Sequence, residues 1–305
     1  METVAPALDA VELTKTYGGS RGIADVSLRV ERGECFGFLG PNGAGKTTFI
    51  RLALGLLRPH QGSVSIMGTD LSEDRLGALA NVGYLPGELA LYPALTGART
   101  LDALARLHPR PSTLRDELLD LLDLERRDLG RRVREYSRGM KQKLGLVAAL
   151  QHDPPLVILD EPTGGLDPVM QARLLDYLAA RSRAGRTIFF SSHVLSEVEQ
   201  LCDRVAMVRD GRLLLVRRVE DLPLGSLRMV RVTFSEPMPS DVYRATNVSG
   251  LEVDGSTHRF TFTGNPAPVI AALANLPVID LVIEPARLED LFRNLYDPTA
   301  VEVPV

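Results

Sequence analysis

One segment near the N-terminus constrains the fold more than any other part of this sequence. The apolar run Cys35–Leu39 leads directly into a glycine-rich stretch, and apolar residues then recur at helical spacing, at Phe49, Ile50, Ala53, Leu56 and Leu57. This order predicts a buried strand, a tight loop and a helix. Short apolar runs at 156–159 and 187–191 lack alternation, which is typical of a parallel sheet covered on both faces. We therefore expect an α/β fold.

The loop between this strand and helix is rich in glycine and ends in a cation and a hydroxyl. Its residues are Gly40, Pro41, Asn42, Gly43, Ala44, Gly45, Lys46 and Thr47, followed by Thr48. Glycines let backbone N–H groups turn toward an anion, the helix presents its positive end, and lysine adds a mobile charge. The pattern predicts a site for nucleotide phosphates, with Thr47 as a Mg²⁺ ligand. The alternative is a glycine-rich turn without a ligand.

Two carboxylates follow the apolar run 156–159, at Asp160 and Glu161. Ligands of open parallel sheets bind at the carboxyl ends of the strands. We therefore expect Asp160 to hold Mg²⁺ and Glu161 to be the general base for an attacking water. The alternative is an acidic strand end that only adds solubility.

The segment 136–142 distinguishes among phosphate chemistries, because kinases and GTPases share the loop. Ser137 and Gly139 open a predicted helix here, and in these residues the sequence resembles the ATP-binding cassette (ABC) family from about residue 9 to residue 220. Other family motifs follow in family order. Tyr17 matches the aromatic residue that stacks on adenine, Asp167 the loop that communicates across the dimer, and His193 the switch histidine.

The resemblance implies a P-loop NTPase core in domain 1–220. It consists of a RecA-like parallel-sheet subdomain, an antiparallel β subdomain and a helical lobe at about residues 88–150. Two such domains sandwich two ATP molecules, so that Ser137 and Gly139 of one close on the phosphate loop of the other, and a homodimer is the simpler expectation. Lys46, Glu161 and His193 are then catalytic. The alternative role for His193 is to cap the helix that follows it. The alternative for Tyr17 is an exposed turn residue that does not contact adenine.

Two positions depart from the family pattern. Gly87 stands where the family has a glutamine that ligates Mg²⁺. Either Glu88 supplies a carboxylate to the metal, water fills the place, or magnesium affinity and coupling to the membrane partner are altered. Arg138 replaces the usual glycine of the signature and puts a cation beside it.

The sequence changes character beyond residue 220. Prolines and glycines separate short alternating runs, which predicts a small α+β domain at 221–305. An amphipathic helix is expected at its end, with Leu288, Leu291, Phe292 and Leu295 on one face. This domain stabilises the dimer, limits activity or is a passive cap that covers an exposed face.

Composition excludes several classes of protein. The 305 residues carry a net charge of −4 and have a pI of about 5.8, which argues against a nucleic-acid partner. Cys35 and Cys202 match neither a disulfide framework nor a metal-ligand spacing, and Cys35 is expected to be a small core residue rather than a redox switch. No apolar run reaches the roughly 18 residues that cross a bilayer, and no signal peptide is visible. We expect a cytoplasmic chain.

Together these features predict the ATPase subunit of an exporter, bound to the cytoplasmic face of the membrane through a separate permease. The resemblance is to the multidrug and antibiotic exporter branch, of the daunorubicin-resistance type, which implies efflux of a drug, antibiotic or lipid-like molecule. One alternative is a soluble ABC ATPase that acts on a non-membrane partner such as the ribosome or DNA. Another is a small-molecule kinase, although Ser137, Gly139 and His193 would then have no explanation.

Overall fold

The computed structural model describes residues 4–18, 21–222, 227–243 and 248–285. The chain divides into two compact units, Met1–Val219 and Glu220–Val305. The sequence placed this boundary near residue 220. No helix in the described ranges is both long and apolar enough to cross a membrane.

The first sheet of the N-terminal unit is antiparallel, with strand order β2-β1-β4-β5. Its strands are β1 (Leu8–Tyr17), β2 (Arg21–Val30), β4 (Gln61–Ile66) and β5 (Thr69–Asp70). The sequence predicted shorter strands, with a turn from Tyr17 to Gly22. The ladder instead continues until Tyr17 lies opposite Arg21, because the antiparallel partners keep pairing to the end of the hairpin.

The second sheet has six strands in the order β10-β9-β3-β8-β7-β6. All neighbours are parallel except for β10, which is antiparallel to β9. Every residue of β3, β7 and β8 is buried, as expected for strands covered on both faces. The strands are β3 (Cys35–Leu39), β6 (Val82–Leu85), β7 (Leu156–Asp160), β8 (Thr187–Ser192), β9 (Arg204–Arg209) and β10 (Arg212–Arg218).

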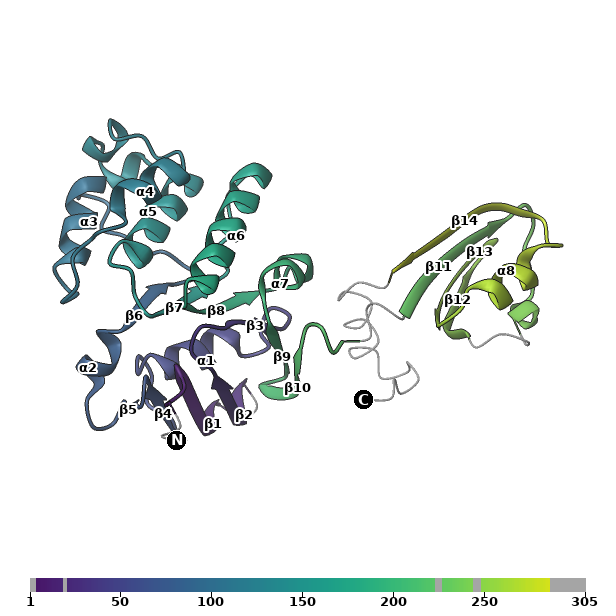
Figure 1. Cartoon of the computed structure of the whole chain (residues 1–305), viewed down its shortest axis with the longest axis horizontal. Coiled ribbons are helices and arrows are strands. Elements are labelled where there is room, and N and C mark those ends of the chain that lie inside the picture. The colour runs from purple at the N-terminus through teal and green to yellow at the C-terminus, as the bar shows by residue number, and fades with distance from the viewer. Residues whose placement is uncertain (1–3, 19–20, 223–226, 244–247, 286–305) are drawn as a thin grey trace. The chain divides into compact units, whose positions relative to one another are not determined.

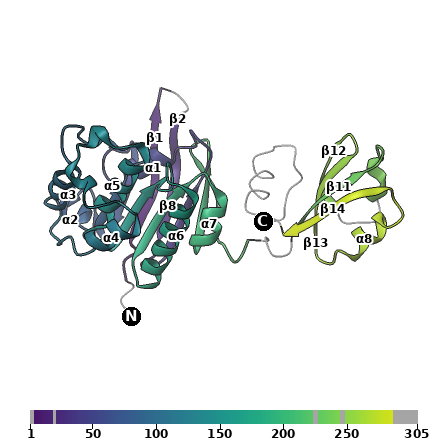
Figure 2. The same ribbon diagram turned by 90° about the horizontal axis from the view of Figure 1, so that it is seen from above.

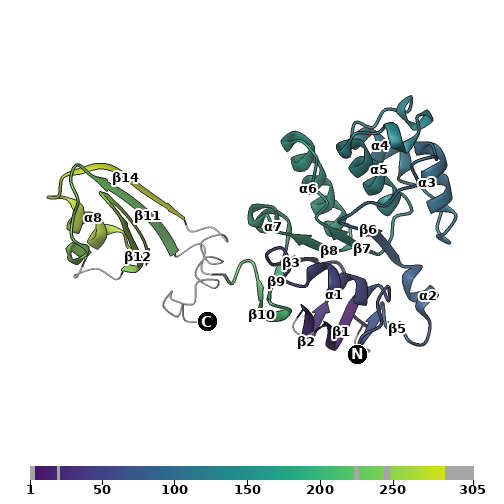
Figure 3. The same ribbon diagram turned by 180° about the vertical axis from the view of Figure 1, so that it is seen from behind.

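Three helices cover the faces of this sheet. The helix α1 (Lys46–Ala53) lies between the two sheets, whereas α6 (Pro168–Arg183) and α7 (Leu195–Leu201) cover the opposite face, as Figures 1 and 3 show. The predicted helix after the loop continued to Leu57. It ends earlier because Gly55 takes a left-handed conformation, with φ of 60°, which stops a helix.

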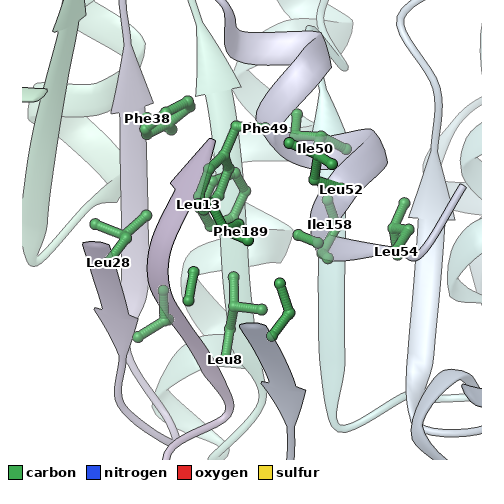
Figure 4. Packing of buried hydrophobic residues seen from close by; sticks show 14 of the residues in the cluster. Leu8, Leu13, Leu28, Phe38, Phe49, Ile50, Leu52, Leu54, Ile158 and Phe189 are labelled. Atoms are coloured by element: carbon green, nitrogen blue, oxygen red, sulfur yellow. The ribbon is translucent and has the colours of Figure 1, made fainter. Parts of the chain in front are cut away.

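The core between the two sheets is built around aromatic side chains. Phe49 of α1 stacks on Phe189 of β8, with ring centroids 5.8 Å apart, and lies 4.8 Å from the ring of Phe38 in β3. Leu13 of β1 lies against the same cluster (Figure 4). Full burial of a side chain such as phenylalanine contributes about 1.5–3 kcal/mol, so this cluster fixes the start of α1 against the sheet.

A helical lobe lies at one end of the N-terminal unit, where α3, α4 and α5 gather in Figures 1 and 2. The sequence pattern over residues 112–135 is helical, with Leu114, Leu118, Leu121 and Leu122 forming an apolar stripe. The structure has one short α-helix there, followed by two 3₁₀ turns at Asp128–Gly130 and Val133–Glu135, because Asp123 takes a φ of 45° and ends the first. The α-helices are α2 (Arg75–Leu79), which precedes the lobe, α3 (Gly97–Ala105), α4 (Arg115–Leu121) and α5 (Arg138–Leu150).

The C-terminal unit is a four-stranded antiparallel sheet with strand order β12-β13-β11-β14. Its elements are β11 (Leu227–Phe234), a 3₁₀ turn at Ser240–Tyr243, β12 (Val248–Asp254), β13 (Thr257–Thr263), α8 (Ala267–Leu273) and β14 (Val278–Pro285). Apolar residues of β11, β13, α8 and the turn form its core. The structure thus confirms the predicted fold class for this part of the chain. The helix predicted around Leu288 to Leu295 lies outside the described residues.

Candidate active site

The phosphate loop, residues 40–47, joins β3 to α1 and needs glycine for steric reasons. A Cβ on Gly45, where φ is 104°, would lie 2.7 Å from Cγ2 of Ile23. A Cβ on Gly40 would lie 2.5 Å from the carbonyl oxygen of Val208. Gly45 also precedes the first turn of α1 and offers no side-chain cap, so the N–H groups of that turn remain available to an anion.

Lys46 is held inside this loop and is only 6% exposed. Its Nζ donates hydrogen bonds to the carbonyl oxygens of Gly40 (2.7 Å) and Pro41 (3.3 Å). Nζ also lies 3.6 Å from Oε1 of Glu161. Burial lowers the pKa of Lys46, while the charges of Glu161 and Asp160 act in the opposite direction. The loop therefore holds a mobile cation next to two carboxylates.

Asp160 ends β7 and is 2% exposed. Its Oδ2 accepts a hydrogen bond from the Thr47 hydroxyl (3.0 Å), and its Oδ1 accepts one from the Ser191 hydroxyl (2.5 Å). A buried carboxylate is unfavourable unless it is compensated. Hydroxyl and carboxylate oxygens are the donors that Mg²⁺ prefers, so this set fits the metal. The structure brings together Thr47 and Asp160, two of the three predicted ligands, and adds Ser191 behind them.

Glu161 follows Asp160 in a strained conformation. Its φ of 51° lies in the left-handed region, which is uncommon for residues other than glycine and often marks functional sites. The backbone N–H of Glu161 donates to the Ser191 carbonyl (3.1 Å), and its Oε1 lies 3.2 Å from Nδ1 of His193. The three residues predicted to be catalytic, Lys46, Glu161 and His193, therefore meet at one carboxylate.

The N-cap position of α7 is Val194, which makes no side-chain capping hydrogen bond. Ser192 accepts a hydrogen bond from the Val194 N–H (2.9 Å) and donates one to Oε2 of Glu197 (2.7 Å). His193 itself is 54% exposed and points to Glu161 rather than into the helix. The capping explanation for His193 is thus wrong, because its neighbour Ser192 makes the local hydrogen bonds.

Gly87, not Glu88, lies against the predicted metal ligand. A Cβ on Gly87 would be 3.3 Å from Oδ2 of Asp160. Glu88 is exposed, and within the described residues no hydrogen bond or ion pair joins it to Thr47 or Asp160. Burial, followed by the Asp160 charge, raises the pKa of nearby Tyr84 to about 12, so its phenol stays neutral.

The signature segment packs on the loop at 165–167. Ser137 caps α5 by accepting a hydrogen bond from the Met140 N–H (3.2 Å), and a Cβ on Gly139 would be 2.9 Å from the Gly165 carbonyl oxygen. Asp167 caps α6 through the Met170 N–H (3.0 Å), which lowers the pKa of that carboxyl. Within the described part of the chain, no hydrogen bond or ion pair joins Ser137 to residues 40–48.

The structure also shows the surroundings of Tyr17 and Gln142. Tyr17, the predicted adenine contact, is 44% exposed at the end of β1, with Nζ of Lys15 5.9 Å from its ring centroid. Gln142 was missed by the sequence analysis. It is 8% exposed and donates to the Pro162 carbonyl (2.8 Å), which ties the signature helix to the segment after Glu161. Its signal in the sequence was a polar residue at helical spacing on a buried face, shared with Gly145, Leu146 and Ala149.

Known proteins are similar to this chain in sequence and in fold. Residues 23–164 match the family described as ABC transporter. The uncharacterized ABC transporter ATP-binding protein YhcH of Bacillus subtilis is 34% identical over 308 residues, which span 99% of each chain. The bacitracin transport ATP-binding protein BcrA of Bacillus licheniformis is 37% identical over 94% of this chain and 96% of the relative.

A solved structure described as the ATP binding subunit of an ABC transporter matches with a TM-score of 0.66 and 32% identity. The match covers 72% of this chain and 92% of that one. Similarity over nearly the full length of two relatives agrees with the geometry of the phosphate loop and its acidic neighbours. This chain therefore belongs to the ABC transporter ATP-binding proteins, a family of ATPases.

Proposed function

We propose that this chain powers an exporter, with ATP hydrolysis driving transport through a separate permease. The observation that carries the proposal is the meeting of Lys46, Glu161 and His193 beside the Thr47–Asp160 pair. The bacitracin relative supports a drug, an antibiotic or a lipid-like molecule as the cargo. The chain would then lie on the cytoplasmic face of the membrane, held by its permease.

In the proposed mechanism, the loop N–H groups and Lys46 hold the β and γ phosphates. Glu161 accepts a proton from the water that attacks the γ-phosphorus in line, and the bond to the ADP oxygen breaks. His193 lies 3.2 Å from the same carboxylate and so orients it.

Thr47 and Asp160 would hold Mg²⁺ next to these phosphates. When bound, the ion offsets the negative charge that develops during phosphoryl transfer. Ser191 fixes the Asp160 carboxylate through the second oxygen. Gly87 offers no side chain to the metal, so Glu88 would reach it only through a change in the 86–89 loop.

A homodimer would complete the site. Gly139 packs against the Gly165 carbonyl oxygen of the 165–167 loop, and Ser137 caps α5. As donors at a helix start, they suit the γ-phosphate held by a second copy. Tyr17, with an exposed ring, would stack on the adenine of the ATP bound by its own chain.

The permease would dock beside the helical lobe. A cavity of about 220 Å³ lies there between α3, α5 and β6, with a mostly apolar lining that includes Leu56, Leu79 and Leu107. Leu56 and Leu107 are 51% and 76% exposed, an apolar surface suited to an apolar helix of a partner. Loss of substrate-stimulated hydrolysis in vesicles containing the permease, after Leu56→Ser and Leu107→Ser, would support this site, and normal stimulation would refute it.

The proposed activity is tested by phosphate release from MgATP with the purified chain. Lys46→Ala should abolish both nucleotide binding and hydrolysis, because it removes the cation of the phosphate loop. The matched control is Arg127→Ala, which removes an exposed cation from the helical lobe and should change neither. Equal activity of wild type and Lys46→Ala would contradict the proposal.

A further inference from the structure

The two cysteines of the chain lie side by side, although 167 positions separate them in the sequence. Their sulfur atoms are 3.7 Å apart, both thiols are free, and their exposed fractions are 0% for Cys35 and 7% for Cys202. Cys35 is the first residue of β3, and Cys202 directly follows α7.

The backbone fixes this proximity. The Asp203 N–H donates to the Cys35 carbonyl (2.8 Å), and the Cys35 N–H donates to Oδ2 of Asp203 (2.8 Å). The pairing of β3 with β9 continues from this point, with Phe36 opposite Arg204. Neighbouring strands are about 4.8 Å apart. Disulfides join Cα atoms about 4.4–6.8 Å apart, so this part of the sheet places the two cysteines in range.

Gly37, two residues after Cys35 on β3, has no side chain and so allows Cys202 to pack closely. A Cβ on Gly37 would lie 3.2 Å from Sγ of Cys202 and 2.6 Å from Cγ1 of Val198. Cys202 therefore packs onto the face of β3 that carries Cys35 and Gly37, and any larger residue at 37 would push α7 away. Closing the sulfur distance to the bond length of about 2 Å requires side-chain rotation rather than a new backbone position.

We propose that Cys35 and Cys202 form a reversible disulfide site, oxidised by a peroxide, that slows ATP turnover. Cys202 is nearer the surface and reacts first: its sulfur takes one oxygen of hydrogen peroxide to form a sulfenic acid, and one water leaves. The Cys35 sulfur then displaces the hydroxyl, which leaves as a second water while the S–S bond forms. The two thiols lose two electrons, and these reduce the O–O bond of the peroxide.

The order of reaction follows from burial. Burial raises the pKa of the Cys35 thiol, which makes it a poor first nucleophile but does not prevent it from resolving a sulfenic acid at contact distance. Oxidation is therefore expected to be slow and to need a small oxidant.

The crosslink would restrain the segment that carries His193. The start of α7 is tied to Ser192 by Glu197. Its end already pairs with β3 through Asp203, and a disulfide would make that tie covalent, next to the strand that leads into the phosphate loop. Both ends of α7 would then be fixed relative to the loop. If closing of the site requires His193 to shift against the phosphate loop, turnover falls.

The test is peroxide treatment of the full-length chain, followed by thiol alkylation and peptide mapping without reductant. We expect a linked Cys35–Cys202 peptide, a several-fold fall in MgATP turnover and recovery of both with dithiothreitol. Cys35→Ser should keep its turnover under peroxide and accumulate a sulfenic acid at Cys202, trapped by dimedone. Cys202→Ser should resist the oxidant at both readouts.

Two results would overturn this proposal: separate alkylation of both thiols after peroxide, or a quantitative crosslink with unchanged turnover. Reversal by dithiothreitol in the wild-type chain does not depend on how well the variants fold. The rate effect rests on the proposed ATPase function, whereas the crosslink is read by mass and would be found even if that function were wrong.

Discussion

The two units of this chain bury different kinds of side chain. The N-terminal unit buries Lys46, Asp160 and Glu197, whereas the buried polar side chains in the described part of the C-terminal unit are His258 and Thr261. Charged groups are costly to bury, so a fold retains them where they are paired or where they act. The comparison indicates that the first unit accepts unfavourable burial of charged groups near the phosphate loop and β7, whereas the described part of the second unit buries no charged side chain.

The largest expected effect on ATP hydrolysis comes from changing Glu161 in the first unit, with a carboxylate of the second unit changed as the control. Glu161→Gln should reduce phosphate release at saturating MgATP by about 10²–10⁴-fold, because it removes the general base. Nucleotide binding should persist. Glu252→Gln changes an exposed carboxylate on β12 and should leave the rate unchanged. Similar rates for the two variants would remove the basis for assigning the chemistry to the first unit.

The next largest effect is on metal affinity, after removal of the hydroxyl that holds Asp160. Ser191→Ala removes the hydroxyl that binds Oδ1 of Asp160, and it should weaken Mn²⁺ binding to the ATP-loaded chain by about 10–100-fold. Titration followed by electron paramagnetic resonance measures this affinity. Ser249→Ala, on an exposed position of β12, is the matched control, and unchanged affinity in both variants would argue against a metal at Asp160.

A smaller effect distinguishes a partly buried ion pair from an exposed one. Arg186 and Arg181 lower the pKa of Asp153 from 3.8 to about 2. Because the folded pKa is the lower one, the ionised carboxylate stabilises the fold above about pH 4, and this contribution is lost as the pH falls toward 2. At pH 7, Asp153→Asn should lower the free energy of unfolding by about 1–2 kcal/mol.

The control for this pair lies in the C-terminal unit. Asp280 is 54% exposed and lies 3.9 Å from Arg231, so Asp280→Asn should cost less than about 0.5 kcal/mol. Urea unfolding of both variants at pH 7 and pH 3 measures the difference. Equal losses at pH 7 would show that burial does not separate the two pairs.

The smallest effect tests the packing role of the C-terminal unit. Tyr243 and His258 share a buried hydrogen bond of 3.0 Å from the hydroxyl to Nδ1. Tyr243→Phe should lower the unfolding free energy of this unit by about 1 kcal/mol. ATP turnover should not change, and a fall in turnover without unfolding would assign this unit a part in the chemistry.

The sequence was most informative where local chemistry and local structure coincide. The bounds of β3 and the start of α1 followed from an apolar run that meets a glycine-rich loop, and Asp160 ended its strand as predicted. The sequence pattern did not predict where a helix ends when a single backbone angle sets that end. Gly55 and Asp123 end α1 and α4 by taking positive φ values, although apolar residues at helical spacing continue beyond both.

Contacts across the sheet could not be predicted from spacing. Ser191 reaches Asp160 because β8 pairs with β7, and Cys35 meets Cys202 because β3 pairs with β9. Neither strand pairing can be inferred from the sequences of the two strands involved. Gln142 is intermediate, because its position on a buried helix face was visible but its partner, the Pro162 carbonyl, was not.

The central claim is that one chain holds only half of each ATP site. Steady-state MgATP hydrolysis, measured per chain against protein concentration and corrected with Glu161→Gln, tests it most directly. The account predicts that turnover per chain rises with concentration and then levels off as two chains complete each site. Turnover that is constant over the whole range, with wild type remaining monomeric in the presence of ATP, would contradict it.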